Sequence, residues 1–147
     1  MKISEVMTRD VQIAKPDETV RNVARLMADL GIGAMPAAEN DRLIGMITDR
    51  DIAVRGVANG KGPDTPIREV MTAEVEYCFD DDSVEEVARK MDQLQVRRLP
   101  VLNREKRLVG IVSLGDLALE ADEPAARALQ GISRPGGKHS QADASKH

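Results

Sequence analysis

One pattern occurs twice in the chain, as Gly45-Met46-Ile47-Thr48-Asp49-Arg50-Asp51 and as Gly110-Ile111-Val112-Ser113-Leu114-Gly115-Asp116. In each copy a glycine and two apolar residues lead to a hydroxyl residue, and a carboxylate follows three positions later. An apolar run that meets a hydroxyl and then a carboxylate predicts a strand that turns directly into a helix.

The repetition extends outward from this pattern over most of the chain. With a shift of 64 positions, residues 3–8 align with residues 67–72, and the apolar positions of residues 20–30 align with those of residues 84–94. One residue is inserted in the second copy near Asn103. Each copy is therefore expected to be one supersecondary unit that buries its apolar face against its twin.

The predicted order of elements in each copy is β-α-β-β-α, which is a mixed α/β (α+β) fold. The apolar residues of 20–30 and 84–94 recur in steps of three and four, as on the buried face of a helix. Thr19 and Ser83 are suited to cap these helices, and Gly31 is suited to end the first.

Short strands are predicted at residues 11–14 and 75–78, before the helices. The strands that reach Pro36 and Pro100 are expected to lie at a sheet edge or to stop there, because proline cannot donate to a strand ladder. The apolar run that precedes each hydroxyl residue of the doubled pattern predicts a further strand.

Composition restricts the classes of partner. The chain has 147 residues and a formal net charge of −4, with acids and bases mixed along it. It has no basic stripe and only two aromatic residues, Tyr77 and Phe79, which argues against a nucleic-acid partner. Cys78 is the only cysteine, and no apolar run is long enough to cross a bilayer. We expect a cytoplasmic protein without membrane association.

The doubled strand-to-helix turn has two interpretations. Thr48 with Asp51, and Ser113 with Asp116, have the spacing of a capping box, in which each side chain bonds the other residue's amide. The same geometry fits a nucleotide site, because a helix N-terminus attracts phosphate and a carboxylate can accept both hydroxyls of a ribose. Recurrence at the same point of both copies favours the nucleotide site.

Other residues could complete such a site. The strands that contain Met35-Pro36 and Leu99-Pro100 have edges whose backbone groups could contact an adenine ring. Arg50, Arg97 and Arg98 could bind phosphate, because a guanidinium group is bidentate. For each arginine the alternative is a solvated charge or an ion pair.

Two β-α-β-β-α copies, each with Val-Met-Thr near its start and Gly-apolar-apolar-Thr/Ser-x-x-Asp near its end, resemble a tandem pair of CBS domains. The resemblance covers roughly residues 3 to 120. Within the family, the chain is similar to small stand-alone bacterial CBS proteins of signal-transduction or stress type. The resemblance implies two intertwined repeats related by pseudo-twofold symmetry. The expected boundaries are repeat 1 at 1–58, a linker at 59–66, repeat 2 at 67–121, a short helix at 122–132 and a disordered tail at 133–147.

The family implies a regulatory sensor of adenosine ligands (AMP, ADP, ATP, NAD or S-adenosylmethionine), bound in clefts between the two domains, with no required cofactor. It also implies a homodimer whose rearrangement signals in trans to an unknown protein effector. Four apolar residues on the short late helices are expected to be available to the second copy: Ile52, Val54, Leu117 and Leu119.

The resemblance also assigns roles to residues. Asp51 and Asp116 would hold ribose hydroxyls, and Thr48 and Ser113 would bind phosphate or ribose. The base would be surrounded by the backbone around Ala14, Met35, Cys78 and Leu99. Because Leu114-Gly115 replaces Asp49-Arg50, the second site would need a phosphate partner from elsewhere, and the first is expected to favour ligands with more phosphate.

An enzyme is not expected. Both histidines, His139 and His147, lie in the tail, and Cys78 has no histidine or second cysteine near it in sequence. No spacing of ligating residues predicts a zinc site. The alternative to a sensor is a ligand-free structural or interaction protein, in which both turns are only helix caps.

Overall fold

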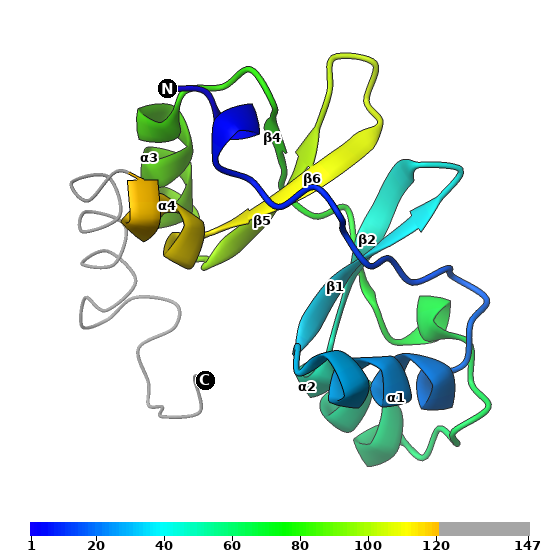
Figure 1. Ribbon diagram of the computed structural model, residues 1–147. Helices are drawn as coiled ribbons and strands as arrows, with labels where there is room; N and C mark the ends of the chain where they lie inside the picture. Colours follow the sequence, from blue (N-terminus) through cyan, green and yellow to red (C-terminus); the bar gives the residue numbers. More distant parts are fainter. Residues whose placement is uncertain (121–147) are drawn as a thin grey trace. The chain divides into compact units, whose positions relative to one another are not determined.

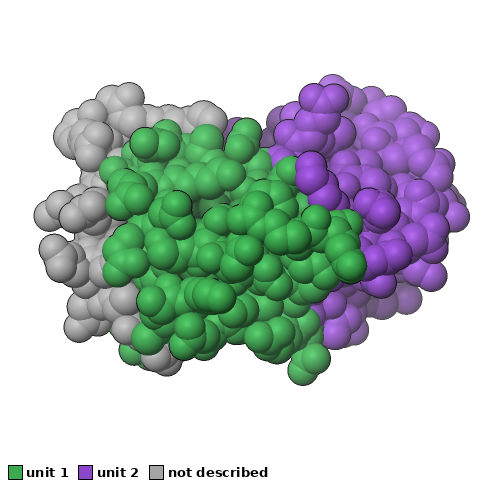
Figure 2. All heavy atoms as spheres, turned by 90° about the horizontal axis from the view of Figure 1, so that it is seen from above, with its two compact units in different colours: residues 1–10, 76–105, 109–147 green, residues 11–75, 106–108 purple. Residues whose placement is uncertain are grey.

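The computed structural model describes residues 1–120. It confirms a mixed α/β fold made of two compact units, which Figure 2 shows in different colours. The first-repeat unit comprises residues 11–75 with 106–108, and the second-repeat unit comprises the other described residues. The helix expected at 122–132 and the tail from Ser133 lie outside the described residues.

The first-repeat unit has a three-stranded sheet in the order β1-β2-β3. Figure 1 shows α1 and α2 together at the end of the β1–β2 hairpin that is opposite to its turn. Its elements are helix α1 (Val20–Leu30), strands β1 (Ala34–Glu39) and β2 (Arg42–Thr48), helix α2 (Asp49–Asp51), the π-helix η2 (Ile52–Gly56), the 3-10 helices η3 (Val57–Asn59) and η4 (Ile67–Glu69), and strand β3 (Thr72–Ala73).

The second-repeat unit has a three-stranded sheet in the order β4-β5-β6. Helices α3 and α4 again lie away from the turn of the hairpin (Figure 1). Its elements are the 3-10 helix η1 (Ile3–Glu5), strand β4 (Cys78–Phe79), helix α3 (Val84–Leu94), strands β5 (Arg98–Leu102) and β6 (Leu108–Ser113), and helix α4 (Leu114–Glu120).

Helices α1 and α3 occupy the predicted positions because local signals define both ends. Thr19 Oγ1 accepts the N–H of Asn22 at 3.1 Å, and Gly31 ends α1 with a left-handed φ of 67°. Ser83 and Glu86 form the full capping box of α3, with bonds of 3.0 and 3.1 Å.

The leading segment of each repeat packs in the unit formed mainly by the other repeat. The N–H of Ile3 donates to Asp82 O at 2.9 Å, and the N–H of Ile67 donates to Glu18 O at 2.8 Å. Both isoleucine side chains are fully buried. This exchange of segments is the intertwining that the fold class predicted.

Each glycine of the doubled pattern lies where the backbone of an exchanged segment passes close to its strand. A Cβ at Gly45 would lie 2.5 Å from Thr72 O, and a Cβ at Gly110 would lie 2.8 Å from Thr8 O. Gly45 pairs with Ala73 across β2 and β3. Only a residue without a side chain allows the two backbones to approach this closely.

The expectation that these strands stop at their prolines was wrong, and the expected edge position holds for β1 but not for β5. Strand β1 continues past Pro36 to Glu39, and Pro100 lies within β5, the central strand of its sheet. The N–H of Ala14 donates to Pro36 O at 2.9 Å, and the N–H of Ala38 donates to Ala14 O at 3.0 Å. The neighbour therefore uses the proline's carbonyl and needs no N–H from it.

The predicted short strands are shorter than expected. In residues 11–14 only Ala14 pairs, with Ala37, whereas β4 pairs at two positions with β5. The N–H of Asp80 donates to Leu102 O at 2.9 Å and extends β4 pairing. The equivalent residue in the first repeat is Pro16, which has no N–H, so the ladder stops.

The inserted residue lengthens one hairpin loop. Asn40 and Asp41 connect β1 to β2 with φ of 53° and 64°, as a two-residue turn with two left-handed residues requires. The longer loop between β5 and β6 carries Arg104, whose guanidinium bonds Asp81 at 2.8 Å and lies 4.1 Å from the Phe79 ring centroid. The hydrogen bond from Arg104 holds the pKa of Asp81 below its usual range.

Candidate functional site

The first strand-to-helix turn is closed by reciprocal hydrogen bonds. The N–H of Thr48 donates to Asp51 Oδ2 at 3.1 Å, and the N–H of Asp51 donates to Thr48 Oγ1 at 2.9 Å. The N–H of Asp49 donates to Gly33 O at 2.9 Å, which fixes the turn against the start of β1. Ala34 is the register partner of Thr48, so this strand lies beside the turn.

The second turn repeats this geometry in the other unit. The N–H of Ser113 donates to Asp116 Oδ2 at 3.0 Å, and the N–H of Asp116 donates to Ser113 Oγ at 3.2 Å. The N–H of Leu114 donates to Arg97 O at 2.9 Å. The same backbone contact therefore joins each turn to the residue that precedes β1 or β5.

Both carboxylates are thus helix caps, as the first of the two interpretations predicted. Each uses Oδ2 for the cap, and each side chain is only partly buried. Because a carboxylate has about four acceptor positions, Oδ1 can still accept hydroxyl hydrogens while Oδ2 holds the amide. Capping and ligand binding are compatible at Asp51 and Asp116.

The residues expected around a base are all buried, in two sets. Ala14, Met35 and Pro36 lie in the first-repeat unit, and Cys78, Leu99 and Pro100 lie in the second-repeat unit. The carbonyl of Pro36 already accepts a hydrogen bond from the first set's own Ala14. Any contact with a base at this strand would therefore use the remaining backbone groups.

The three arginines expected to bind phosphate lie in two units, Arg50 in the first-repeat unit and Arg97 and Arg98 in the second-repeat unit. Arg50, Arg97 and Arg98 are exposed. Arg55, which was not among the expected site residues, forms an ion pair with a motif carboxylate, with Nε 3.9 Å from Asp51 Oδ1. Its Nη1 also donates to Met71 O at 3.1 Å. The spacing of four residues from Asp51 on a helix is the signal that could have identified it.

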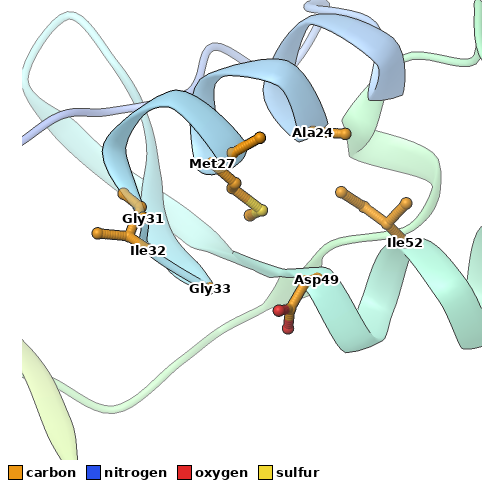
Figure 3. A pocket seen from close by; sticks show the side chains of 8 residues that line it. Ala24, Met27, Gly31, Ile32, Gly33, Asp49 and Ile52 are labelled. Atoms are coloured by element: carbon orange, nitrogen blue, oxygen red, sulfur yellow. The ribbon is translucent and has the colours of Figure 1, made fainter.

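A hollow of about 460 Å³ lies beside the first turn (Figure 3). It is formed by the end of α1, the residues that lead into β1, and the first residues of α2 and η2. Its lining is mostly apolar, including Met27, Ile32 and Ile52, and Asp49 supplies a carboxylate. Thr48 and Asp51 do not line it, so this hollow and the capped carboxylate are distinct features.

Cys78 is buried in the core of the second-repeat unit. Burial raises the pKa of its thiol to about 12, and the charge of Asp82 acts in the same direction. The reactive thiolate is therefore scarce at neutral pH. Among residues 1–120 there is no group of three or more side chains placed to hold a metal ion. Within the same range no helix is long and apolar enough to cross a membrane.

A model of the CBS domain matches the sequence twice, at residues 3–56 and 67–123. The chain belongs to the CBS-domain family. As a CBS-domain protein it is 41% identical, over 89% of its length, to CBS domain-containing protein YhcV of Bacillus subtilis, and the match covers 94% of YhcV.

Solved structures agree with this membership. A crystal structure of hypoxic response protein I with two coordinated zinc ions has a TM-score of 0.75 and 36% identity, and the match covers 82% of this CBS-domain protein and 98% of that chain. The CBS domain pair of protein MJ0100, in complex with 5′-methylthioadenosine and S-adenosyl-L-methionine, has a TM-score of 0.70 and 26% identity, with 81% and 94% covered.

Proposed function

We propose that this protein is a cytoplasmic regulatory module that senses an adenosine-containing ligand and acts in trans on a protein effector by rearrangement of a dimer. The observation that supports this most directly is the aspartate that caps the helix in both repeats and keeps one acceptor oxygen outside the cap. The MJ0100 pair is crystallised with two adenosine derivatives, which supports the same ligand class here. No catalytic group is part of the proposal.

Each proposed site is built from one turn. Asp51 and Asp116 accept the ribose hydroxyls, and Thr48 and Ser113 contribute hydroxyl groups to ribose or phosphate. Arg50, Arg97 and Arg98 are proposed for phosphate, which arginine binds with paired donors. In each site the base is proposed to lie against backbone groups of the buried residues described above.

Replacing either motif aspartate with alanine is expected to weaken ligand binding strongly and to reduce stability only slightly. Asp51→Ala or Asp116→Ala should weaken binding of AMP, ATP, NAD or S-adenosylmethionine by roughly ten- to a hundredfold, because charge-assisted hydrogen bonds contribute about 1.5–3 kcal/mol. Loss of the cap alone should cost only about 1 kcal/mol of stability. Calorimetric titration and thermal unfolding measure the two effects.

Glu86→Ala is the matched control, because Glu86 makes the same reciprocal cap with Ser83 but lies outside the motif. It should lower stability by a similar amount and leave ligand affinity unchanged. Wild type that binds none of the ligands would favour the alternative, in which both turns are only caps in an interaction protein. Binding that neither aspartate variant weakens would reject the residue assignment.

A homodimer is proposed from the apolar side chains left on the late helices. Val54 is 47% exposed and Leu119 is 83% exposed. Leu117, which was expected to be available to a partner, is instead fully buried in its own unit. Leu117 packs in the core cluster that contains Leu99 and Val112, and Ile52 is partly buried against the core of the first-repeat unit. A twofold pair is the commonest way for soluble proteins to cover exposed apolar residues.

Light scattering is expected to give twice the 16.0 kDa mass of the chain. Val54→Glu should raise the dissociation constant of the dimer by about tenfold or more, because it places an unpaired charge in the contact. A monomeric mass for the wild type at micromolar concentration would refute the dimer.

A further inference from the structure

Arg55 lies where the helix after the first turn is widened. Residues Ile52–Gly56 form a π-helix, a rare element that occurs frequently at functional sites. From this turn the guanidinium reaches back to Asp51 and sideways to the carbonyl of Met71, at 3.9 and 3.1 Å. The Arg55 side chain is still 50% exposed. It therefore combines a fixed position with open donors.

The second repeat has no cation at the equivalent place. Four residues after Asp116 the sequence has Glu120, whereas four residues after Asp51 it has Arg55. The second repeat carries its arginine before the turn instead, at Arg97, and the aligned residue of the first repeat is Gly33. The two turns have the same backbone bonds, but their arginines stand at different positions in the sequence.

Asp49 makes the Gly33 side of the first turn unsuitable for an anion. A Cβ at Gly33 would lie 2.9 Å from Asp49 Oδ2, so the carboxylate fills the space beside this glycine. A phosphate placed there would meet a like charge. Near Arg55 a phosphate would meet a guanidinium group, which binds phosphate through paired, charge-assisted hydrogen bonds.

We propose that Arg55, more than Arg50, binds the phosphate in the first-repeat site and makes that site select phosphorylated adenosine ligands over uncharged ones. This inference rests on the proposed function, because it takes Asp51 as the ribose partner. It assigns the phosphate to the Arg55 side of the carboxylate rather than to the β1 side.

The test compares AMP with adenosine in the full chain carrying Asp116→Ala, so that the first-repeat site is the one measured. Arg55→Gln should weaken AMP binding by about tenfold and change adenosine binding by less than about twofold. Arg55→Lys should recover part of the loss, because lysine keeps the charge without the planar fork. Arg25→Gln, an exposed arginine of α1, is the control for net charge.

Several results would overturn the inference. Equal losses for AMP and adenosine would show that Arg55 only supports the local structure through Met71. A loss in Arg25→Gln as large as in Arg55→Gln would show a long-range charge effect. A larger loss in Arg50→Gln would assign the phosphate to Arg50. If the chain with Asp116→Ala alone binds neither AMP nor adenosine, the proposed function fails as well. If it binds adenosine but not AMP, only the proposed selectivity is contradicted.

Discussion

Shortening Ile67 to alanine is expected to lower the free energy of unfolding by about 2–5 kcal/mol, the usual cost of emptying a buried isoleucine site. The side chain is fully buried in the core of the first-repeat unit, although its residue opens the second sequence repeat. Ile3→Ala should cost a similar amount in the second-repeat unit, where Ile3 is also fully buried. Urea unfolding followed by circular dichroism measures both.

Arg68→Ala is the matched control for Ile67, because Arg68 is the next residue of the same 3-10 turn and is exposed. Surface substitutions of this kind change stability by only about 0.5 kcal/mol. If Ile67→Ala costs no more than Arg68→Ala, the exchanged segment is not part of the core.

Gly45→Val is expected to destabilise the protein by about 3 kcal/mol, at the upper end of the cost of overpacking. The new Cβ would meet the carbonyl oxygen of Thr72 at 2.5 Å, and a backbone atom in a paired strand cannot move away as a flexible side chain can. The expected response is separation of β3 from β2. Thermal unfolding gives the size of the loss, and amide exchange at Ala73 shows where it occurs.

Gly62→Val is the matched control, because a Cβ at Gly62 would have no atom within 4 Å and its φ is not in the left-handed region. It should change stability by about 0.5 kcal/mol or less. A similar loss in both variants would mean that the glycine at position 45 is not required by the close approach of Thr72.

The helices could be predicted because their signals are local. The step of three and four residues and the caps at Thr19 and Ser83 lie within the segments they define. The strands depend on a neighbour that the local sequence does not contain. The effect of Pro36 depended on whether Ala14 uses its carbonyl or its nitrogen, and only the paired backbone shows that it uses the carbonyl.

The same division applies to the candidate site. The pairing of each hydroxyl with its carboxylate followed from a three-residue spacing, and the caps at Asp51 and Asp116 have that geometry. The four-residue spacing of Arg55 from Asp51 is a local signal, whereas its π-helix and its bond to the carbonyl of Met71 have no signature in the nearby sequence. The space filled by Asp49 beside Gly33 is likewise a property of packing, with no signature in the sequence.

The exchange of leading segments also sets an order for folding during synthesis. Residues 1–10 leave the ribosome before the rest of the second-repeat unit, and the N–H of Thr8 bonds the carbonyl of Ile111, so the segment has no complete partner until β6 has been made. The segment that opens the second repeat docks much sooner, since Glu18 already exists when Ile67 emerges. Until the core residues from Cys78 to Leu117 have been made, the apolar side chain of Ile3 lacks its packing partners and is open to other nascent chains. Residues 1–10 are therefore made before residues 67–72 but complete their packing after them.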